Sequence, residues 1–316
     1  MRELKILIIL IFFTGLTYYG IEPYAHHVMH PAVAEPDYAF SDLENFDAKG
    51  DAANGKKSFA ANCQGCHSLS SDSILPPMSH AELVSAYGVY PPDLSTAGDL
   101  YDPKFLANFI KNPANASFES TYKMHKQEQV AKAKASASAE EQEALQKSFE
   151  KEVAAFEAKN KISMPSFSYL PDQEIADIIA YLQEVKKETT PKEAAVQACG
   201  RCHSVKYAGI VENSSRDQLI TYLGSFPPDL SQMIKSKGED YLHKFINDPQ
   251  KTLPGTGMQR VGLTKDAQDK VVKYLENVGD SKKSEREELG AYVIGFFVIL
   301  TFFAYLFKVN AFKEVH

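Results

Sequence analysis

The sequence predicts an all-α protein in which two small helical domains follow one another between two apolar terminal segments. Apolar residues recur every three or four positions near the end of each half, as in Ile175, Ile178 and Leu182 and again in Val271 and Leu275, which is the period of an amphipathic helix. Alternation with the period of a strand is scarce. The third observation is an internal repeat, which divides the chain into two similar halves.

The repeat becomes visible when Cys63 is placed on Cys199. The two halves then align without a gap through the string PPDLS, which occupies 91–95 in the first half and 227–231 in the second. A shared order of letters over such a length indicates a duplicated domain. Further matched pairs are Leu106 and Leu242, Phe109 and Phe245, Ile110 and Ile246, and Pro113 and Pro249.

The chain begins with a segment, 1–21, that we predict to be a membrane anchor. Its apolar run from Ile6 to Ile21 follows two basic residues, an arrangement shared by signal anchors and signal peptides. The letters AVA at 32–34 resemble a cleavage site, but the apolar run is long and ends well before them. We therefore favour a retained anchor over a cleaved signal, with a linker following at 22–49.

The first predicted domain spans 50–186 and the second spans 187–280. The first is longer because of an insertion at about 119–161, whose Ala, Lys, Glu and Gln residues are typical of solvent-exposed helix. A docking surface is the alternative role for this insertion. In the second domain the letters TPKE at 190–193 predict a helix start with a capping box. The uncharged run at 289–307 is long enough to cross a bilayer as a helix.

Composition and charge exclude some classes of function. The 316 residues are 44% hydrophobic, which is typical of a folded protein. The net charge of −7 gives no electrostatic basis for binding nucleic acid, whereas an acidic surface is suited to a basic protein partner.

All four cysteines lie in two strings, CQGCH at 63–67 and CGRCH at 199–203. Such strings occur in zinc sites, in redox dithiols and at haem attachment points. A zinc site would leave the histidines without a role and would draw its ligands from two separate repeats. A redox dithiol would need a strand-to-helix setting that the repeats lack. Covalent haem accounts for every position, so the two strings predict two haem groups.

In the haem interpretation, two thiols bond to the porphyrin vinyl groups and the histidine ligates the iron. The second axial ligand decides the function, because a strong one leaves no open position for a substrate. Met164 and Met258 are the candidates, since they lie at nearly the same distance before the closing helices of their domains. Met124 or His125, inside the insertion, is the alternative for the first haem. The predicted haem residues are Cys63, Cys66, His67 and Met164 in the first domain and Cys199, Cys202, His203 and Met258 in the second.

Other expectations concern the surroundings of the haems. The repeated Pro-Pro is expected to place a backbone carbonyl against the second nitrogen of the axial histidine, to form a rigid turn, or both. Arg260, close to Met258 in the chain, is a candidate to neutralise a haem propionate. Residues without a counterpart in the other copy are expected to be surface or packing residues: Met78, Met233, His80 and His243.

These features resemble class I cytochrome c domains, which have a CxxCH string near the start, a proline turn, an axial methionine and a closing helix. In this chain the closing helices end in Tyr-Leu, at 181–182 and 274–275. The string Gly-x-Tyr/Phe-PPDLS at 88–95 and 224–231, with a single anchor after the last domain, resembles cytochrome c1. The chain is similar to the di-haem c1-type subunits of bacterial quinol–cytochrome c reductase (bc1) complexes.

The resemblance implies an electron carrier that is not catalytic by itself. It implies two covalently bound haem c groups, a Rieske iron–sulfur protein as donor, cytochrome b as a neighbouring subunit, and a soluble cytochrome c or a terminal oxidase as acceptor. It also implies a location in the bacterial inner membrane, with the haem domains on the periplasmic side. Two alternatives stay open: the di-haem subunit of a cbb3-type oxidase, whose anchor precedes its haems, and a di-haem peroxidase, which needs one iron with a displaceable ligand.

Overall fold

The structure, a computed structural model, describes residues 2–29, 35–159 and 162–313. Over these residues the chain is helical, with isolated bridge pairs and no β-strand. Two further facts agree with this architecture: the helices fall into two similar sets, and a long apolar helix lies at each end. The all-α prediction is therefore confirmed.

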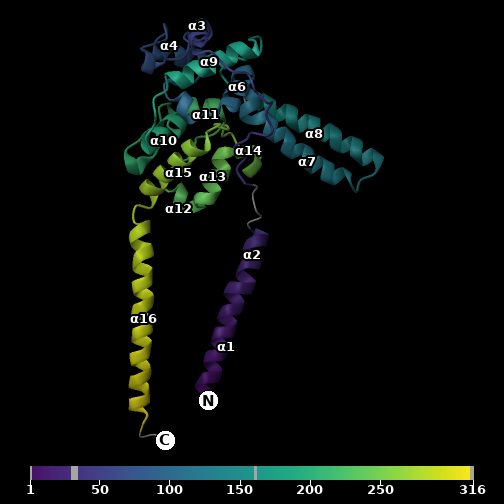
Figure 1. Ribbon diagram of the computed structural model, residues 1–316. Coiled ribbons are helices and arrows are strands. Elements are labelled where there is room, and N and C mark those ends of the chain that lie inside the picture. The colour runs from purple at the N-terminus through teal and green to yellow at the C-terminus, as the bar shows by residue number, and fades with distance from the viewer. Residues whose placement is uncertain (1, 30–34, 160–161, 314–316) are drawn as a thin grey trace.

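Both terminal segments form helices that are long and apolar enough to cross a membrane. The N-terminal one consists of α1 (Arg2–Leu16), a π-helical turn (Thr17–Ile21) and α2 (Glu22–Met29), and the C-terminal one is α16 (Lys283–Ala311). Their apolar side chains are exposed rather than packed against the protein. Both helices project from the same side of the helical head, and the two chain ends lie at their far ends (Figure 1).

The described residues of the first domain form seven α-helices: α3 (Ala52–Asn62), α4 (His80–Tyr87), α5 (Ala97–Leu100), α6 (Pro103–Lys111), α7 (Ser120–Lys134), α8 (Ala139–Lys159) and α9 (Asp172–Glu184). Its core forms where α9 packs on α3, with Ile175 and Leu182 buried beside Phe59, as their helical spacing predicts. Gly55 allows this contact, because a Cβ there would lie 1.9 Å from the Asp177 carbonyl oxygen.

The second domain repeats this plan with six α-helices: α10 (Pro191–Cys199), α11 (Arg216–Leu223), α12 (Met233–Lys237), α13 (Glu239–Asn247), α14 (Pro249–Thr252) and α15 (Lys265–Gly279). Helix α10 packs on α15, which buries Val271 and Leu275. The expected capping box is present at the start of α10, where Glu193 N–H donates to Thr190 Oγ1 at 3.3 Å and Thr190 N–H donates to the Glu193 carboxylate at 3.0 Å.

The insertion in the first domain is a helical hairpin made of α7 and α8, which projects sideways from the head (Figure 1). Near its base, Tyr122 stacks on Phe156 with 3.7 Å between ring centroids. Further out, Lys126 pairs with Glu152 at 2.7 Å across the two helices. The exposed helical insertion is therefore as the sequence predicts.

The two domains pack against each other through short backbone contacts. Tyr101 forms an isolated bridge with Leu263, and Thr264 N–H donates to the Leu100 carbonyl at 2.9 Å. Tyr101 packs against the cores of both domains. Helices α10 to α15 of the second domain lie between α3, α4 and α9 of the first domain and the apolar helix α16 (Figure 1).

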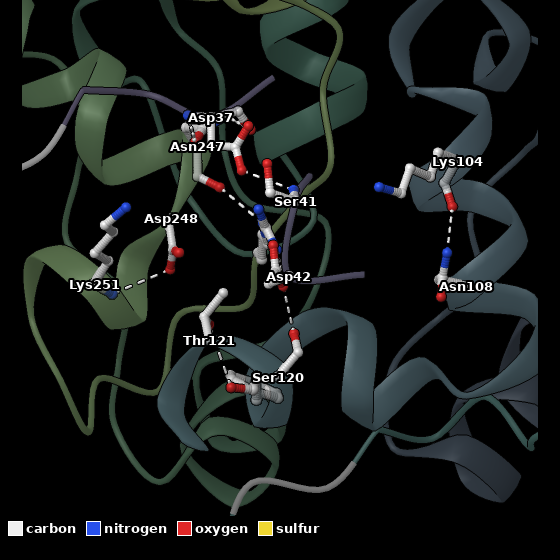
Figure 2. A network of polar contacts seen from close by, with 12 residues as sticks. Asp37, Ser41, Asp42, Lys104, Asn108, Ser120, Thr121, Asn247, Asp248 and Lys251 are labelled. Carbon is white, nitrogen blue, oxygen red and sulfur yellow. Dashed lines mark hydrogen bonds and ion pairs between the residues drawn. The ribbon is translucent and has the colours of Figure 1, made fainter. Parts of the chain in front are cut away.

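Part of the linker, residues 37–43, is packed into the head. Phe40 and Leu43 are buried against Phe105 of the first domain, while Asp37 and Asp42 turn toward the second domain (Figure 2). The sequence reasoning described this stretch only as a linker. The signal that could have indicated packing is the pair of large apolar residues Phe40 and Leu43 in an otherwise polar, acidic stretch.

Candidate haem-binding sites

Each CxxCH string lies at the end of the first helix of its domain. Helix α3 ends at Asn62, and α10 ends at Cys199. In both strings the chain then turns back, so that His67 N–H donates to the Cys63 carbonyl at 3.0 Å and His203 N–H to the Cys199 carbonyl at 2.9 Å. These hydrogen bonds fold the backbone of each histidine back to that of the first cysteine of its string.

The thiols are available for covalent attachment. All four cysteines are free, so neither string has closed into a disulfide. Burial, followed by the neighbouring thiol of the same string, raises the pKa of Cys63 and of Cys199 to about 12, so both are neutral thiols at neutral pH. Among the described residues, no three His, Cys, Asp or Glu side chains gather as a conventional metal site.

The histidines are oriented by matching hydrogen bonds. His67 Nδ1 lies 2.8 Å from the Pro92 carbonyl oxygen, and His203 Nδ1 lies 2.8 Å from that of Pro228. A carbonyl can only accept, so each Nδ1 carries the proton and each Nε2 keeps a free lone pair. Burial lowers the pKa of both imidazoles. This effect is larger than that of the hydrogen bond to the proline carbonyl, which raises the pKa. The expected carbonyl contact is confirmed, and it suits ligation of iron by Nε2.

An aspartate that the sequence reasoning did not single out holds each proline turn in place. Asp93 accepts hydrogen bonds from the backbone and hydroxyl groups of Ser70, at 3.0 and 2.6 Å. Burial raises the pKa of Asp93, but hydrogen bonds led by those of Ser70 and Ser95 outweigh it and bring the pKa to about 2. In the second domain Asp229 accepts from Ser204 at 2.9 Å. The repeated letters PPDLS were the signal for this role.

The two candidate methionines are placed differently. Met164 packs against the first core together with Cys63. Met258 is half-buried in the loop before α15, and its N–H donates to Thr256 Oγ1 at 3.4 Å. Met233 is the methionine, among the described residues, that packs together with Cys199 against the core of the second domain. Met164 therefore shares a core with its attachment string, whereas the assignment of Met258 rests on its place in the repeat, and both assignments stay predictions.

The alternative ligands for the first haem lie on the hairpin. Met124 lines a small hollow with Asp42 and Arg260, and His125 pairs with Gln129 at 2.8 Å. Met164, unlike Met124, packs against the core that Cys63 also contacts, and the axial ligand of the first haem stays a prediction.

Two of the unmatched histidines have packing partners, as expected. His80 stacks on Tyr90 with ring centroids 4.3 Å apart. His243 lies against the buried Gln268, with 3.0 Å between His243 Nδ1 and Gln268 Nε2.

The expectation that Arg260 neutralises a haem propionate is wrong. Its guanidinium is buried and donates from one nitrogen to both carboxylate oxygens of Asp42, at 2.8 and 2.7 Å, and from Nε to the Asn247 carbonyl at 3.1 Å. It also lies 4.7 Å from the ring centroid of Phe40. The buried Asp42 requires a positive partner, so Arg260 is committed to the linker and not to a cofactor.

Comparison with known proteins agrees with this geometry. A family model described as cytochrome c matches residues 52–146 and 192–279, which together exceed half of the chain and include both CxxCH strings. A search of curated proteins gives no match. A solved chain described as "Hyperthermophilic respiratory Complex III" aligns over 98% of this chain and 99% of that chain, at 18% identity and a TM-score of 0.30. That score is too low to establish a common arrangement.

The family match carries the assignment, because it covers both repeats and each repeat holds its cysteines and histidine in the same geometry. Cytochrome c domains bind haem covalently and transfer electrons. The chain belongs to the cytochrome c family and contains two cytochrome c regions in tandem.

Proposed function

We propose that this chain is a membrane-anchored di-haem cytochrome that carries single electrons as the c1-like subunit of a quinol–cytochrome c reductase. It receives them from a Rieske iron–sulfur protein and passes them toward a terminal oxidase. The observation that carries the proposal is the matched contact of His67 with Pro92 and of His203 with Pro228, both at 2.8 Å. Two equal histidine placements in one chain support two haem sites and not one.

The proposed haem residues divide into attachment and axial groups. Bound haem supplies an iron that changes between the ferric and ferrous states. In each domain a histidine and a methionine would ligate the iron and leave no position for a substrate, so we propose that the chain carries electrons and is not catalytic by itself. Cys63 and Cys66 would attach the first haem, and Cys199 and Cys202 the second. His67 with Met164, and His203 with Met258, would hold the two irons.

The arrangement of the head supports a position at a membrane surface. Two apolar helices leave the head on one side, and the second domain lies closest to α16 (Figure 1). We propose that both helices anchor the chain in the bacterial inner membrane, with the haem domains on the periplasmic side. The second domain then lies nearest to cytochrome b and the membrane-bound donor, and the first domain faces the acceptor.

The second candidate function is the di-haem subunit of a cbb3-type oxidase. The N-terminal helix before the haem domains favours it, because such subunits have their anchor there. The C-terminal helix α16, directly after the second domain, favours the c1-like role. The two candidates differ in their partner subunits, which makes them separable by composition.

Purification of the native complex in mild detergent tests the proposal. The c1-like role predicts co-purification with cytochrome b and a Rieske protein, and two covalent haems per chain by pyridine haemochrome analysis. An oxidase catalytic subunit as the partner would instead establish the cbb3-type role. An iron that binds carbon monoxide readily, with a high-spin spectrum, would overturn the carrier function in favour of a peroxidase.

A further inference from the structure

A single hydroxyl group contacts both methionine loops. Tyr222 lies near the end of α11, and its Oη accepts a hydrogen bond from Ser163 N–H at 3.3 Å and another from Gln259 Nε2 at 3.2 Å. Ser163 directly precedes Met164, and Gln259 directly follows Met258. The two loops that belong to different repeats therefore meet at one oxygen atom.

The end of α11 is closely fitted between the two loops. A Cβ on Gly257 would lie 2.7 Å from the Leu223 carbonyl oxygen, so a glycine is needed for the second loop to come this close. On the other side, a Cβ on Gly224 would lie 3.7 Å from the side chain of Lys159, the last residue of the hairpin helix α8. Close packing at Gly257 leaves the second loop little room to shift against α11, whereas the contact with Lys159 is an ordinary van der Waals contact.

The first loop is fixed to the matching helix of its own domain as well. Ser163 Oγ donates to the Tyr87 carbonyl, at the end of α4, at 2.5 Å. Helix α4 is the counterpart of α11, but the position matched to Tyr222 is Ala86. The first domain thus has no hydroxyl at this place, and the one in the second domain holds both loops.

We propose that Tyr222 is a positioning residue that couples the two methionine loops, so that the placement of Met164 and of Met258 is set at one point. This inference rests on the proposed haem ligation. A thioether ligand must be held over the iron by its loop, because the side chain has three rotatable bonds and orders poorly without support. Loss of the shared acceptor releases a donor in each loop at once.

The test compares Tyr222→Phe with Tyr169→Phe in the full chain carrying its haems. Tyr169 is the control tyrosine, because its hydroxyl donates a hydrogen bond to Asn62 at 3.4 Å and its ring is exposed on the first domain. The readouts are the methionine-to-iron absorption band near the red end of the spectrum and a redox titration of each haem. Thermal unfolding establishes that both variants are folded.

The expected result for Tyr222→Phe is a loss of band intensity and a lower midpoint potential for both haems, because a thioether ligand raises the potential. Tyr169→Phe is expected to leave both unchanged. In a protein whose haems show the methionine band, a change confined to one haem, or no change in either, would overturn the coupling.

Hydrogen exchange of the backbone amides separates this inference from the proposed ligation. Tyr222→Phe is expected to speed exchange in both loops, 162–168 and 255–260, and Gln259→Leu to speed it chiefly in the second. If the unmodified protein lacks the methionine band while exchange rises in both loops of Tyr222→Phe, the coupling stands and the ligand assignment fails. If the band is present and exchange is unaffected, the ligand assignment stands and the coupling fails.

Discussion

The two domains hold their attachment strings in the same way and their methionine loops in different ways. The histidine-to-proline contact is 2.8 Å in both domains. In the second domain the buried Gln250 fixes the loop, since it accepts from Gly255 N–H at 2.9 Å and donates to the Thr256 carbonyl at 2.8 Å. In the first domain the exposed Ser166 donates to the Lys111 carbonyl at 2.5 Å, and the loop follows the hairpin.

This difference shows which parts of a duplicated domain can change independently. The attachment geometry depends on a five-residue string and on one proline turn, and both copies have these letters. The methionine loops depend on the segments packed beside them, which are the hairpin in one copy and the linker in the other. The copies therefore share chemistry at the histidine side and differ in support at the methionine side.

The largest expected effect comes from removing each attachment string in turn. Cys63→Ala with Cys66→Ala, and separately Cys199→Ala with Cys202→Ala, are each expected to leave one covalent haem per chain instead of two. The reason is that the two attachment sites are complete within their own domains. Pyridine haemochrome analysis measures the count. Loss of both haems from one double variant would show that the domains do not bind haem independently.

The next largest effect concerns the buried pair between the linker and the second domain. Arg260→Met leaves the buried Asp42 without its positive partner and is expected to destabilise the head by about 3–5 kcal/mol. Denaturant unfolding measures this change. The control is Lys265→Met, which removes an exposed pair with Asp269 and is expected to cost no more than about 1 kcal/mol.

A second variant distinguishes loss of the ion pair from loss of packing volume. Combining Arg260→Met with Asp42→Leu removes both charges and is expected to recover part of the lost stability, since the uncompensated buried carboxylate is gone. If the double variant lost as much stability as the two single variants added together, this account of the Arg260–Asp42 pair would be contradicted.

A smaller effect is expected from weakening each methionine loop by its own support. Gln250→Leu leaves Gly255 N–H and the Thr256 carbonyl without their partner, so we expect a loss of about 1–3 kcal/mol and a lower potential for the second haem. Ser166→Ala, which removes the hydrogen bond that holds the loop of the first domain, is expected to cost about 0.5–1.5 kcal/mol. Denaturant unfolding and redox titration measure both variants. Equal effects would remove the distinction drawn between the loops.

The smallest effect is expected from shortening the hairpin. Replacing 127–151 with a short Gly-Ser turn keeps the base, where Tyr122 stacks on Phe156 and Lys126 pairs with Glu152. Haem content and both midpoint potentials are expected to stay the same, because the removed part contacts neither domain core. Loss of the first haem would show that the hairpin supports that site.

Much of the fold and the attachment geometry could be predicted from the sequence because the interactions are local. The capping box at Thr190 joins residues three apart, and the closing helices follow from apolar spacing alone. The partner of His67, Pro92, lies 25 residues away, but the string PPDLS that contains it recurs in the second half. This recurrence indicates that the string has a function. Repetition thus revealed a contact that a single copy would have left ambiguous.

By itself, the sequence determined the all-α class, the duplication, the attachment strings and the apolar terminal helices, since each is encoded within a few turns of chain. Only the tertiary structure decided that Arg260 pairs with Asp42, 218 residues away, and that Tyr222 meets Ser163, 59 residues away. Neither partnership leaves a pattern in one sequence, because the contact depends on how independently formed helices pack. A charge beside a candidate ligand looks the same in sequence whether it faces a cofactor or a buried carboxylate.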